Sequence, residues 1–517
     1  MANPTLFSSL LRALTPTDTV NEAGGPAYAL PPKQALAQYA VTGCLNSTFY
    51  ATAETQLERV LELASAVGPE FTAKVALFSR TQGHMKDMPA LLCAALSVLS
   101  PAHLKAVFPR VCDDGRMVRN FVQILRSGAV ARKSLGTVPK KLVLQWLESR
   151  TDEQLFRASV GQNPSLADIV KMVHPRPSTP SRAALYGWLL NRPYDAAALP
   201  ECVRQFEAFK RGETTQVPDV PFQMLTSLTL SETDWMAIAR RAPWQMTRMN
   251  LNTFARHGVF ANRKLTLQIV ERLRDPEAIR SARVFPYQLM MAHMQAVEGV
   301  PGEVRNALQQ AMEVALANVP VIQGRVVVCP DVSGSMLSPV TGHRRGSTTA
   351  VRCLDVAALV AAALVRKNPQ TLVLPFSDDV VPVKLKARNT VLANAQVLAQ
   401  LPSGGTNCSA PFRWLNQERA EADLVVMVSD NMSWVDAEGG GRSTATQAEW
   451  ETFRRRNPRA RLVCLDLQPY GSTQARERAD ILNVGGFSDS VFEILSLFAQ
   501  GELHADHWVG LIESQAL

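Results

Sequence analysis

The chain contains a short apolar stretch that ends abruptly in a loop with one carboxylate and two hydroxyls. Residues 326–330 read Val-Val-Val-Cys-Pro, and Asp331, Ser333 and Ser335 follow at intervals of two. An uninterrupted run rich in β-branched residues is typical of a buried strand in a parallel sheet. Open α/β sheets bind ligands at the carboxyl ends of such strands. Hard oxygen ligands with few charges suit Mg²⁺, so the motif predicts an α/β sheet and a divalent metal site together.

Two later segments supply further oxygen ligands. A glycine-rich stretch at 403–407 reads Ser-Gly-Gly-Thr-Asn, and an apolar run at 423–428 ends in Ser429-Asp430. The predicted metal ligands are Asp331, Ser333, Ser335, Thr406 and Asp430. This ordered set resembles the metal-ion-dependent adhesion site of von Willebrand factor A domains. Turns and helix caps also favour Ser, Thr and Asp, but that alternative explains single positions and not the whole set.

Short apolar runs alternate with helical patterns around this motif. Apolar runs recur at 371–376 and 461–467, and helical patterns cover 355–366, 390–401 and 447–455. Strands that alternate with helices are typical of a parallel sheet covered on both faces. We therefore predict an α/β doubly wound domain in the C-terminal part of the chain.

The sequence favours binding over catalysis. The motifs G-x-x-x-x-G-K-[ST], G-x-S-x-G and H-E-x-x-H do not occur in it. Asp378 and Asp379 follow a predicted strand, where a turn is the simpler interpretation than a paired-carboxylate nuclease site. Asp331 and Asp430 could support metal-assisted hydrolysis. A metal ringed by hydroxyls with one open position is better suited to capturing the carboxylate of a partner protein, so we predict a protein that is not an enzyme.

The excess of positive over negative charge is confined to the N-terminal three-fifths of the chain. Residues 1–324 hold 35 Lys and Arg against 26 Asp and Glu, whereas the remainder holds 19 against 20. Residues 101–150 alone hold ten basic and three acidic residues. A local basic excess favours a polyanionic partner through counterion release. A solvated helical face is the alternative, and charge alone does not decide between the two.

Helical patterns follow one another from residue 31 to about residue 321, without convincing strand alternation. The clearest are 56–67, 90–99, 116–125, 140–146, 165–173, 201–209, 232–240 and 304–316. So many short helices do not form a simple bundle, whereas stacked helix pairs of the HEAT-repeat kind bury each face on a neighbour. We therefore predict an all-α helical-repeat region, although no clear repeat period is visible.

Four segments of this helical region resemble the TROVE module. They are residues 79–92, 165–177, 244–256 and 280–287. A TROVE module followed by a von Willebrand factor A domain is the layout of the Ro autoantigen family, which includes bacterial members. The resemblance implies an N-terminal segment at 1–20, a TROVE helical-repeat domain at 21–322 and an A domain with its adhesion site at 323–517.

The resemblance also implies an RNA-binding ring. In this family the helical module closes around a basic hole that admits single-stranded 3′ ends of misfolded or precursor RNA. Small noncoding Y RNA binds the outer surface. Bacterial members assist exoribonucleases such as polynucleotide phosphorylase in ribosomal RNA maturation and degradation. The residues themselves leave ring closure open, because helix pairs also form open arcs.

A protein that accepts any unpaired RNA end should contact phosphates with cations. The predicted RNA-contact residues are Arg116, Arg119, Arg126, Arg132, Lys133, Lys140, Lys141, Lys171 and His174. Lys171 and His174 lie one helical turn apart, and the family pattern places this histidine at the RNA-binding rim. A solvated face is the alternative for each arginine. For His174 the alternative is a carbonyl-bonded helix end before Pro175.

Cysteine usage and hydropathy favour a cytoplasmic protein with no membrane association. The eight cysteines are scattered without a C-x-x-C pair, and neither a secretory signal nor an apolar run of 18 residues is visible. A second hypothesis is a protein-interaction adaptor whose A domain captures an acidic ligand. The basic excess favours the RNA-binding scaffold. The sequence does not decide whether the basic loop at 341–347 gates the metal site or touches RNA.

Overall fold

The chain divides into two compact units, which are described separately. The computed structural model describes residues 16–43, 45–282, 284, 286–316, 319, 321–343, 351–436, 443–486, 490–502 and 507–517. The sheet unit comprises residues 1–60, 274–295 and 308–511, and the helical unit comprises residues 61–273, 296–307 and 512–517. The units therefore do not correspond to a single cut in the sequence, because the N-terminal residues belong to the sheet unit.

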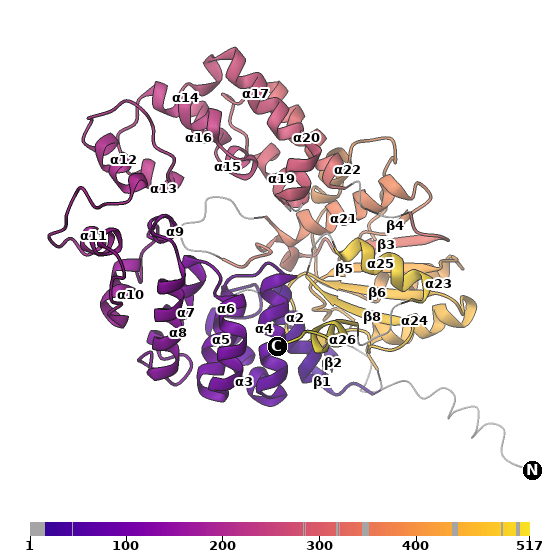
Figure 1. Cartoon of the computed structure of the whole chain (residues 1–517). Coiled ribbons are helices and arrows are strands. Elements are labelled where there is room, and N and C mark those ends of the chain that lie inside the picture. The colour runs from indigo at the N-terminus through magenta and orange to yellow at the C-terminus, as the bar shows by residue number, and fades with distance from the viewer. Residues whose placement is uncertain are drawn as a thin grey trace, which may run out of the picture. The chain divides into compact units, whose positions relative to one another are not determined.

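Five parallel strands form the sheet of the sheet unit, in the order β4-β3-β5-β6-β8 (Figure 1). They are β3 Val326–Pro330, β4 Leu372–Val373, β5 Leu424–Ser429, β6 Arg461–Asp466 and β8 Ile481–Gly485. The register pairs Val326 with Leu424 and Pro330 with Val428, so β3 and β5 end side by side. The chain moves from β3 to one neighbour and then returns to the other side at β5. Ligands of doubly wound sheets bind at this switch point.

Helices pack on both faces of this sheet. They are α21 Cys353–Lys367, α22 Val391–Ala399, α23 Ala410–Gln417, α24 Ala445–Arg456 and α25 Ser490–Gln500. Helix α21 contacts β3 and β5, and α25 contacts β6. A separate core joins Phe412, Trp450 and Phe453 to alternate residues of the strands, such as Val327 and Met427. The predicted doubly wound α/β architecture is confirmed.

A small antiparallel sheet ties the N-terminal residues into the sheet unit. Strand β1 Thr19–Val20 pairs with β2 Pro26–Ala29, which pairs with β7 Ser472–Thr473. Helix α2 Pro32–Thr42 follows and contacts β8. Strands this short carry no alternation pattern, so the sequence does not predict them.

The described residues between 32 and 321 contain helices and no strand, as predicted. The helices are α3 Ala53–Val67, α4 Pro69–Thr81, α5 Asp87–Leu99, α6 Pro101–Val111, α7 Gly115–Ser127, α8 Thr137–Ser149, α9 Asp152–Ala158, α10 Leu166–Val173, α11 Pro180–Leu189, α12 Glu201–Lys210, α13 Phe222–Leu225, α14 Glu232–Arg241, α15 Trp244–Met249, α16 Leu251–Arg256, α17 Arg263–Arg274, α18 Pro276–Ser281, α19 Pro286–Met294 and α20 Gly302–Ala315. A short 3-10 helix, η1, spans Val259–Ala261, and α26 spans His507–Glu513 near the C-terminus. In the helical unit α4 packs on α5 and α6, α5 on α7, and α6 on α8. These five helices thus pack on near neighbours in the chain, as stacked helical repeats do.

Candidate metal centre and nucleic-acid interface

Asp331 lies at the end of β3, fully buried and fixed by three hydrogen bonds. Its backbone N–H donates to a carbonyl of β5 at 2.9 Å. Its Oδ1 atom accepts from the N–H of Ser333 at 2.8 Å, and its Oδ2 atom accepts from the Ser429 hydroxyl at 2.6 Å. The loop continues into a 3-10 helix, Gly334–Leu337, where the Ser335 hydroxyl lies 3.3 Å from that of Ser333. The three side chains of the motif therefore converge.

The glycine-rich loop lies directly against this 3-10 helix. The N–H of Gly334 donates to the carbonyl of Gly404 at 2.9 Å. Two residues later Thr406 is buried, and its carbonyl accepts from the N–H of Trp434, just past β5. Residues from three separate loops thus surround the predicted site, at the end of the sheet where β3 and β5 finish.

Asp378 holds the glycine-rich loop in place. Its Oδ1 atom accepts from the N–H of Gly405 at 3.0 Å, and its carbonyl accepts from the Asn407 amide at 2.9 Å. A Cβ atom at Gly405 would lie 2.6 Å from both Asp378 Oδ1 and Val435 Cγ2, so only glycine fits. The neighbouring Asp379 accepts from the N–H that follows it. Both carboxylates are engaged in turn structure, which favours the turn interpretation over a paired-carboxylate nuclease site.

Asp430 follows β5 and carries a carboxylate oxygen without a regular partner. Its Oδ1 atom accepts from the N–H of Met432 at 3.3 Å. Its Oδ2 atom is buried and accepts no hydrogen bond of regular geometry from the described residues, although the Ser335 hydroxyl lies close by. A buried carboxylate oxygen without a donor is costly unless a cation takes the donor's place.

The electrostatics of the site also fit a cation. Burial, and next the charge of Asp430, raise the pKa of Asp331 to about 7. Burial raises the pKa of Asp430. Burial and the charge of Asp430 raise the pKa of Asp466, at the end of β6, well above its ordinary value. Asp430 thus repels two other buried carboxylates, and a divalent ion would offset that repulsion.

The donor set suits a hard cation with few charged ligands. Across the part of the chain that the structure describes, no group of three or more His, Cys, Asp and Glu side chains has a metal-binding arrangement. The convergent ligands are instead two carboxylates and three hydroxyls, which favours Mg²⁺ over zinc. The five predicted ligands are brought together, and the metal itself stays a prediction.

Tyr50 is a further hydroxyl at this site that the sequence does not predict. It lies in the segment between α2 and α3, and its hydroxyl reaches the side chains of Ser335 and Thr406. Burial, then the charge of Asp430, raise the pKa of Tyr50 to about 12, so this phenol stays protonated at neutral pH. No local sequence signal connects a tyrosine at this position with a motif so distant in the chain.

Four of the predicted RNA-contact residues line one hollow of the helical unit, called here the basic hollow. Arg126 of α7, Lys133 of the next loop, and Lys140 and Lys141 of α8 surround a cavity of about 670 Å³. Its apolar lining comes from Leu135, Leu144 and Met172. All four cationic side chains are exposed. Among the described residues none of them forms an ion pair, so their charge is available to an anionic ligand.

Helix α10 adds Lys171 and His174 beside the basic hollow. The helix contacts α7 and α8, and hydrogen bonds from Ser165, followed by the charges of Lys171 and Arg126, lower the pKa of Asp168. His174 ends the helix with φ 54°, and its N–H donates to the carbonyl of Val170 at 3.0 Å. The backbone of His174 thus terminates α10 while its side chain is exposed.

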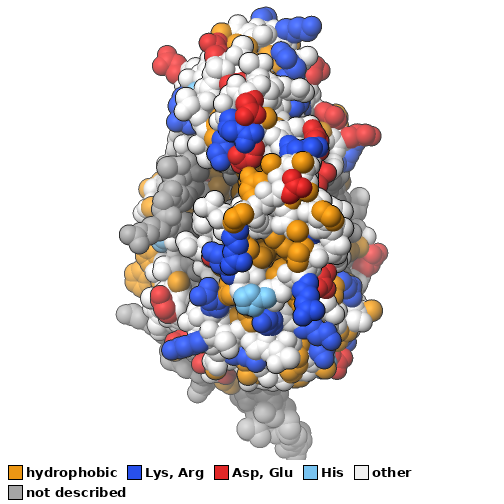
Figure 2. All heavy atoms as spheres, turned by 60° about the vertical axis from the view of Figure 1, so that its left-hand side comes forward, with side chains coloured by type: hydrophobic (Ala, Val, Ile, Leu, Met, Phe, Trp, Pro, Cys, Tyr) orange, Lys and Arg blue, Asp and Glu red, His pale blue; other side chains and the backbone are white. Residues whose placement is uncertain are grey.

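A surface view shows how side chains of each type are distributed on this side of the molecule. Figure 2 turns toward the viewer the side of the molecule where Figure 1 places α8, α10 and α11. On that face Lys and Arg side chains gather around a histidine, and hydrophobic atoms lie between them (Figure 2). Cations next to apolar atoms suit both phosphates and bases of an unpaired strand.

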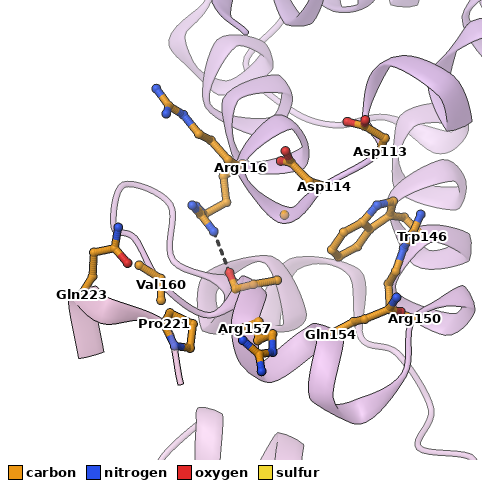
Figure 3. Close-up of a pocket in the computed structure, with 13 residues that line it drawn as sticks. Asp113, Asp114, Arg116, Trp146, Arg150, Gln154, Arg157, Val160, Pro221 and Gln223 are labelled. Atoms are coloured by element: carbon orange, nitrogen blue, oxygen red, sulfur yellow. Dashed lines mark hydrogen bonds between the residues drawn. The ribbon is translucent and has the colours of Figure 1, made fainter. Parts of the chain in front are cut away.

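Arg116 and Arg119 line a different hollow, of about 460 Å³, at the start of α7. Three residues that the sequence did not single out as RNA contacts, Trp146, Arg150 and Arg157, also line it. Figure 3 shows Trp146 and Arg150 side by side at one wall, and the Arg150 guanidinium carbon lies 5.2 Å from the Trp146 ring centroid. Clusters of arginines recur along this part of the chain, but their spacing alone does not reveal which of them share a hollow.

This second hollow has mixed charge. Asp113 and Asp114 also line it (Figure 3). Arg119 donates to the carbonyl of Ala158 at 2.7 Å, and Arg157 pairs with Glu153. Several of its charges are therefore already neutralised or engaged, and the basic hollow is the stronger candidate for binding a polyanion.

Arg132 makes a structural contact within the helical unit. The guanidinium of Arg132 donates to the carbonyl of Ser97 at 3.1 Å and packs against Gly136. This contact anchors the loop between α7 and α8.

Of the basic loop at 341–347, residues 344–347 lie outside the described residues.

Comparisons with known proteins match both the C-terminal part of the helical region and the A domain. A family model described as the Ro60 vWA domain matches residues 325–499, and one described as the TROVE domain matches residues 226–339. A protein of Deinococcus radiodurans named RNA-binding protein RO60 is 26% identical over 549 residues, spanning 96% of this chain and 100% of that protein. A protein of the same name from Caenorhabditis elegans is 22% identical, spanning 46% of this chain and 37% of its own length.

The fold has a counterpart among solved structures. The crystal structure of the Deinococcus radiodurans RO (RSR) protein aligns with a TM-score of 0.62 at 23% identity, and covers 92% of this chain and 100% of that one. Both the helical region and the A domain therefore have the expected architecture. Among the described residues, no helix is long and apolar enough to cross a membrane.

Proposed function

This chain belongs to the Ro protein family, with a TROVE domain and a Ro60-type von Willebrand factor A domain, and we propose that it is a noncatalytic RNA-binding protein. It binds small noncoding Y RNA on the outside of its helical region. It binds single-stranded 3′ ends of misfolded or precursor RNA within the ring that this region forms. These complexes assist cytoplasmic exoribonucleases, such as polynucleotide phosphorylase, in RNA maturation, quality control and the stress response.

The basic hollow is the observation that carries this proposal. Four exposed cations face one cavity without a carboxylate among its lining residues. Like charges held together are stabilised when an anion joins them, and a phosphate backbone supplies one charge per nucleotide. Binding through phosphates is tolerant of sequence, which suits a protein that accepts many RNA ends.

The apolar lining of the hollow supports binding to unpaired strands. Leu144 and Met172 are half-buried, so part of each side chain is open to a ligand. Bases of a single strand are free to lie on apolar side chains, whereas those of a duplex are stacked inside it. A hollow with cations around an apolar floor therefore favours single-stranded over fully paired RNA.

The A domain has a separate role in this proposal. Its metal site holds a divalent ion, Mg²⁺ by the character of its ligands, and the carboxylate of a partner protein completes the coordination. Two large apolar side chains near the site favour a protein partner, since Leu337 is 45% exposed and Trp434 is 48% exposed. A metal-dependent protein-interaction adaptor without RNA binding is the alternative function.

A gel-shift titration tests the RNA-binding function. One RNA carries a structured body with a single-stranded 3′ tail, and a second has the same body with a blunt end. Each is titrated with the wild type, the Lys171→Ala/His174→Ala variant and a control variant, Lys105→Ala, whose lysine is exposed on α6. All titrations are run in Mg²⁺ and in EDTA.

We expect tail-dependent binding that survives EDTA. The affinity for the tailed RNA should fall at least tenfold in the double variant and stay unchanged in the control. Binding that ignores both the tail and the double substitution would contradict this model. In that case, a protein pull-down in Mg²⁺ and in EDTA tests the adaptor function, in which the A domain binds a protein partner through the metal.

A further inference from the structure

The segment between α2 and α3, residues 45–51, is fastened to the metal end of the sheet unit. Ser47 forms an antiparallel bridge with His343, whose N–H donates to the Ser47 carbonyl at 2.8 Å. The Asn46 amide donates to the carbonyl of Thr341 at 2.8 Å. Both partners lie in the loop that directly follows the metal-binding loop. This segment, called here the arm, therefore has a fixed position beside the predicted metal site.

Aromatic contacts fix the direction of Tyr50 within the arm. Its ring meets the ring of Tyr470 edge-on, with centroids 6.0 Å apart, and meets Phe49 at 4.7 Å. Tyr470 is itself buried, and its hydroxyl donates to Gln468 at 3.1 Å. Thr48, two residues before Tyr50, also reaches the Tyr470 side chain. The arm is thus packed against the loop that follows β6.

The hydroxyl of Tyr50 reaches four of the five predicted metal ligands. It lies within hydrogen-bonding reach of Ser335 and Thr406, and within electrostatic reach of Asp331 and Asp430. Ser335 and Thr406 come from two different loops, so an atom within hydrogen-bonding reach of both lies near the point where these loops meet. The inner side of this point is occupied, because Ser429 bonds Asp331 there. Tyr50 is only half-buried whereas the predicted ligands are buried, so we infer that it lies between them and solvent.

We propose that Tyr50 covers the open face of the metal site, so that the arm must move before a carboxylate of another protein can bind there. This inference rests on the metal site proposed above and adds its regulation. The phenol can accept the protons of the two hydroxyls while their lone pairs face the ion. The covered site therefore holds metal without a partner, and displacement of the arm exposes it.

Manganese provides a direct test, since it occupies hard-oxygen sites and speeds the relaxation of water protons that reach it. The full chain is loaded with Mn²⁺, and the relaxation enhancement per bound ion is measured as acetate is added. Asp331→Ala identifies the signal that belongs to the site. Tyr50→Ala removes the whole covering side chain, whereas Tyr50→Phe removes only its hydroxyl. Tyr28→Phe is the control, because Tyr28 also belongs to the N-terminal residues but bonds Ser443.

The wild type and Tyr28→Phe are expected to show a low enhancement that acetate barely changes. Tyr50→Ala should show at least a twofold higher enhancement that acetate lowers, with Tyr50→Phe between them. Binding of Mn²⁺ by Tyr50→Ala but not by the wild type would contradict a cover that closes over a metal-loaded site.

Equal enhancement and equal response to acetate in the wild type and Tyr50→Ala would overturn the cover and leave the metal site standing. Failure of both proteins to bind Mn²⁺ would overturn the cover and the metal site together. The gel-shift experiment is independent of all these outcomes, so loss of RNA binding would not be confused with loss of the cover.

Discussion

Two buried aspartates set the chemistry of the predicted metal site at the residue scale. Asp331 keeps its position through bonds to Ser333 and Ser429, whereas Asp430 leaves one oxygen without a regular donor. The sequence reveals these acids because they follow strand-like runs at fixed spacing from hydroxyl residues. It does not reveal Tyr50, because a tyrosine in a loop has no pattern of its own and reaches the site only through folding.

The metal-free protein is expected to lose stability as pH rises from about 4 to about 7. Burial holds the pKa of Asp331 at about 7, above its ordinary value of 3.8, so in this window the folded chain binds more protons than the unfolded chain. The free energy of unfolding therefore falls as pH rises, by on the order of 1 kcal/mol per pH unit. Urea unfolding in EDTA at several pH values measures it.

Two controls accompany the pH series. Mg²⁺ should reduce the slope, because the ion takes over the role of the proton. Asp331→Asn should flatten the EDTA series, since the amide does not titrate. A slope in Asp331→Asn as steep as in the wild type would assign the effect to other groups.

At the scale of elements, the glycine-rich loop depends on close packing against the turn after β4. Gly405→Ala should weaken Mn²⁺ binding at least tenfold, because the new Cβ would meet Asp378 and Val435 and displace Thr406. Overpacking of this kind costs about 1–3 kcal/mol. Isothermal titration with Mn²⁺ and urea unfolding measure the two effects.

Gly302→Ala is the matched control, because a Cβ there meets nothing within 4 Å. This substitution should leave both the Mn²⁺ affinity and the urea unfolding transition unchanged. Unchanged Mn²⁺ affinity in Gly405→Ala would show that Thr406 does not contribute to the site.

Elements with strong patterns were predictable, and weakly patterned ones were not. The runs that became β3 and β5 are apolar and rich in β-branched residues. All eight helical stretches predicted in the N-terminal region coincide with helices, and two of them, 165–173 and 304–316, run one residue past a helix end. Strand β8 was not predicted, because Asn483 interrupts its apolar run. The Asn483 side-chain amide donates to the carbonyl of Ala475 at 3.1 Å. Its strand conformation depends on pairing with β6, which is a long-range contact.

At the scale of the whole molecule, the charge asymmetry should control the salt dependence of RNA binding. Each phosphate contact to a single strand contributes about 0.7 to the slope of log affinity against log salt concentration. Lys140→Ala/Lys141→Ala should therefore reduce that slope by about 1.4 and weaken binding to all tailed RNAs alike. Filter binding between low and high salt measures this change.

Lys384→Ala/Lys386→Ala is the control for the salt series. Both lysines are exposed in the sheet unit and lie outside the basic hollow. The slope should stay as in the wild type. An equal fall in both double variants would point to diffuse attraction by net charge instead of binding at the basic hollow.

Local patterns in the sequence determined the class of each region: the helical stretches, the two central strands, the metal motif and the basic excess. These properties depend on side-chain periodicity and spacing over a few residues. The tertiary structure decided which distant residues meet, since contacts between remote segments depend on packing and strand pairing. It placed Arg126 and Lys141 around one hollow, assigned the N-terminal residues to the sheet unit through β2 and β7, and brought the Tyr50 hydroxyl within reach of Ser335 and Thr406.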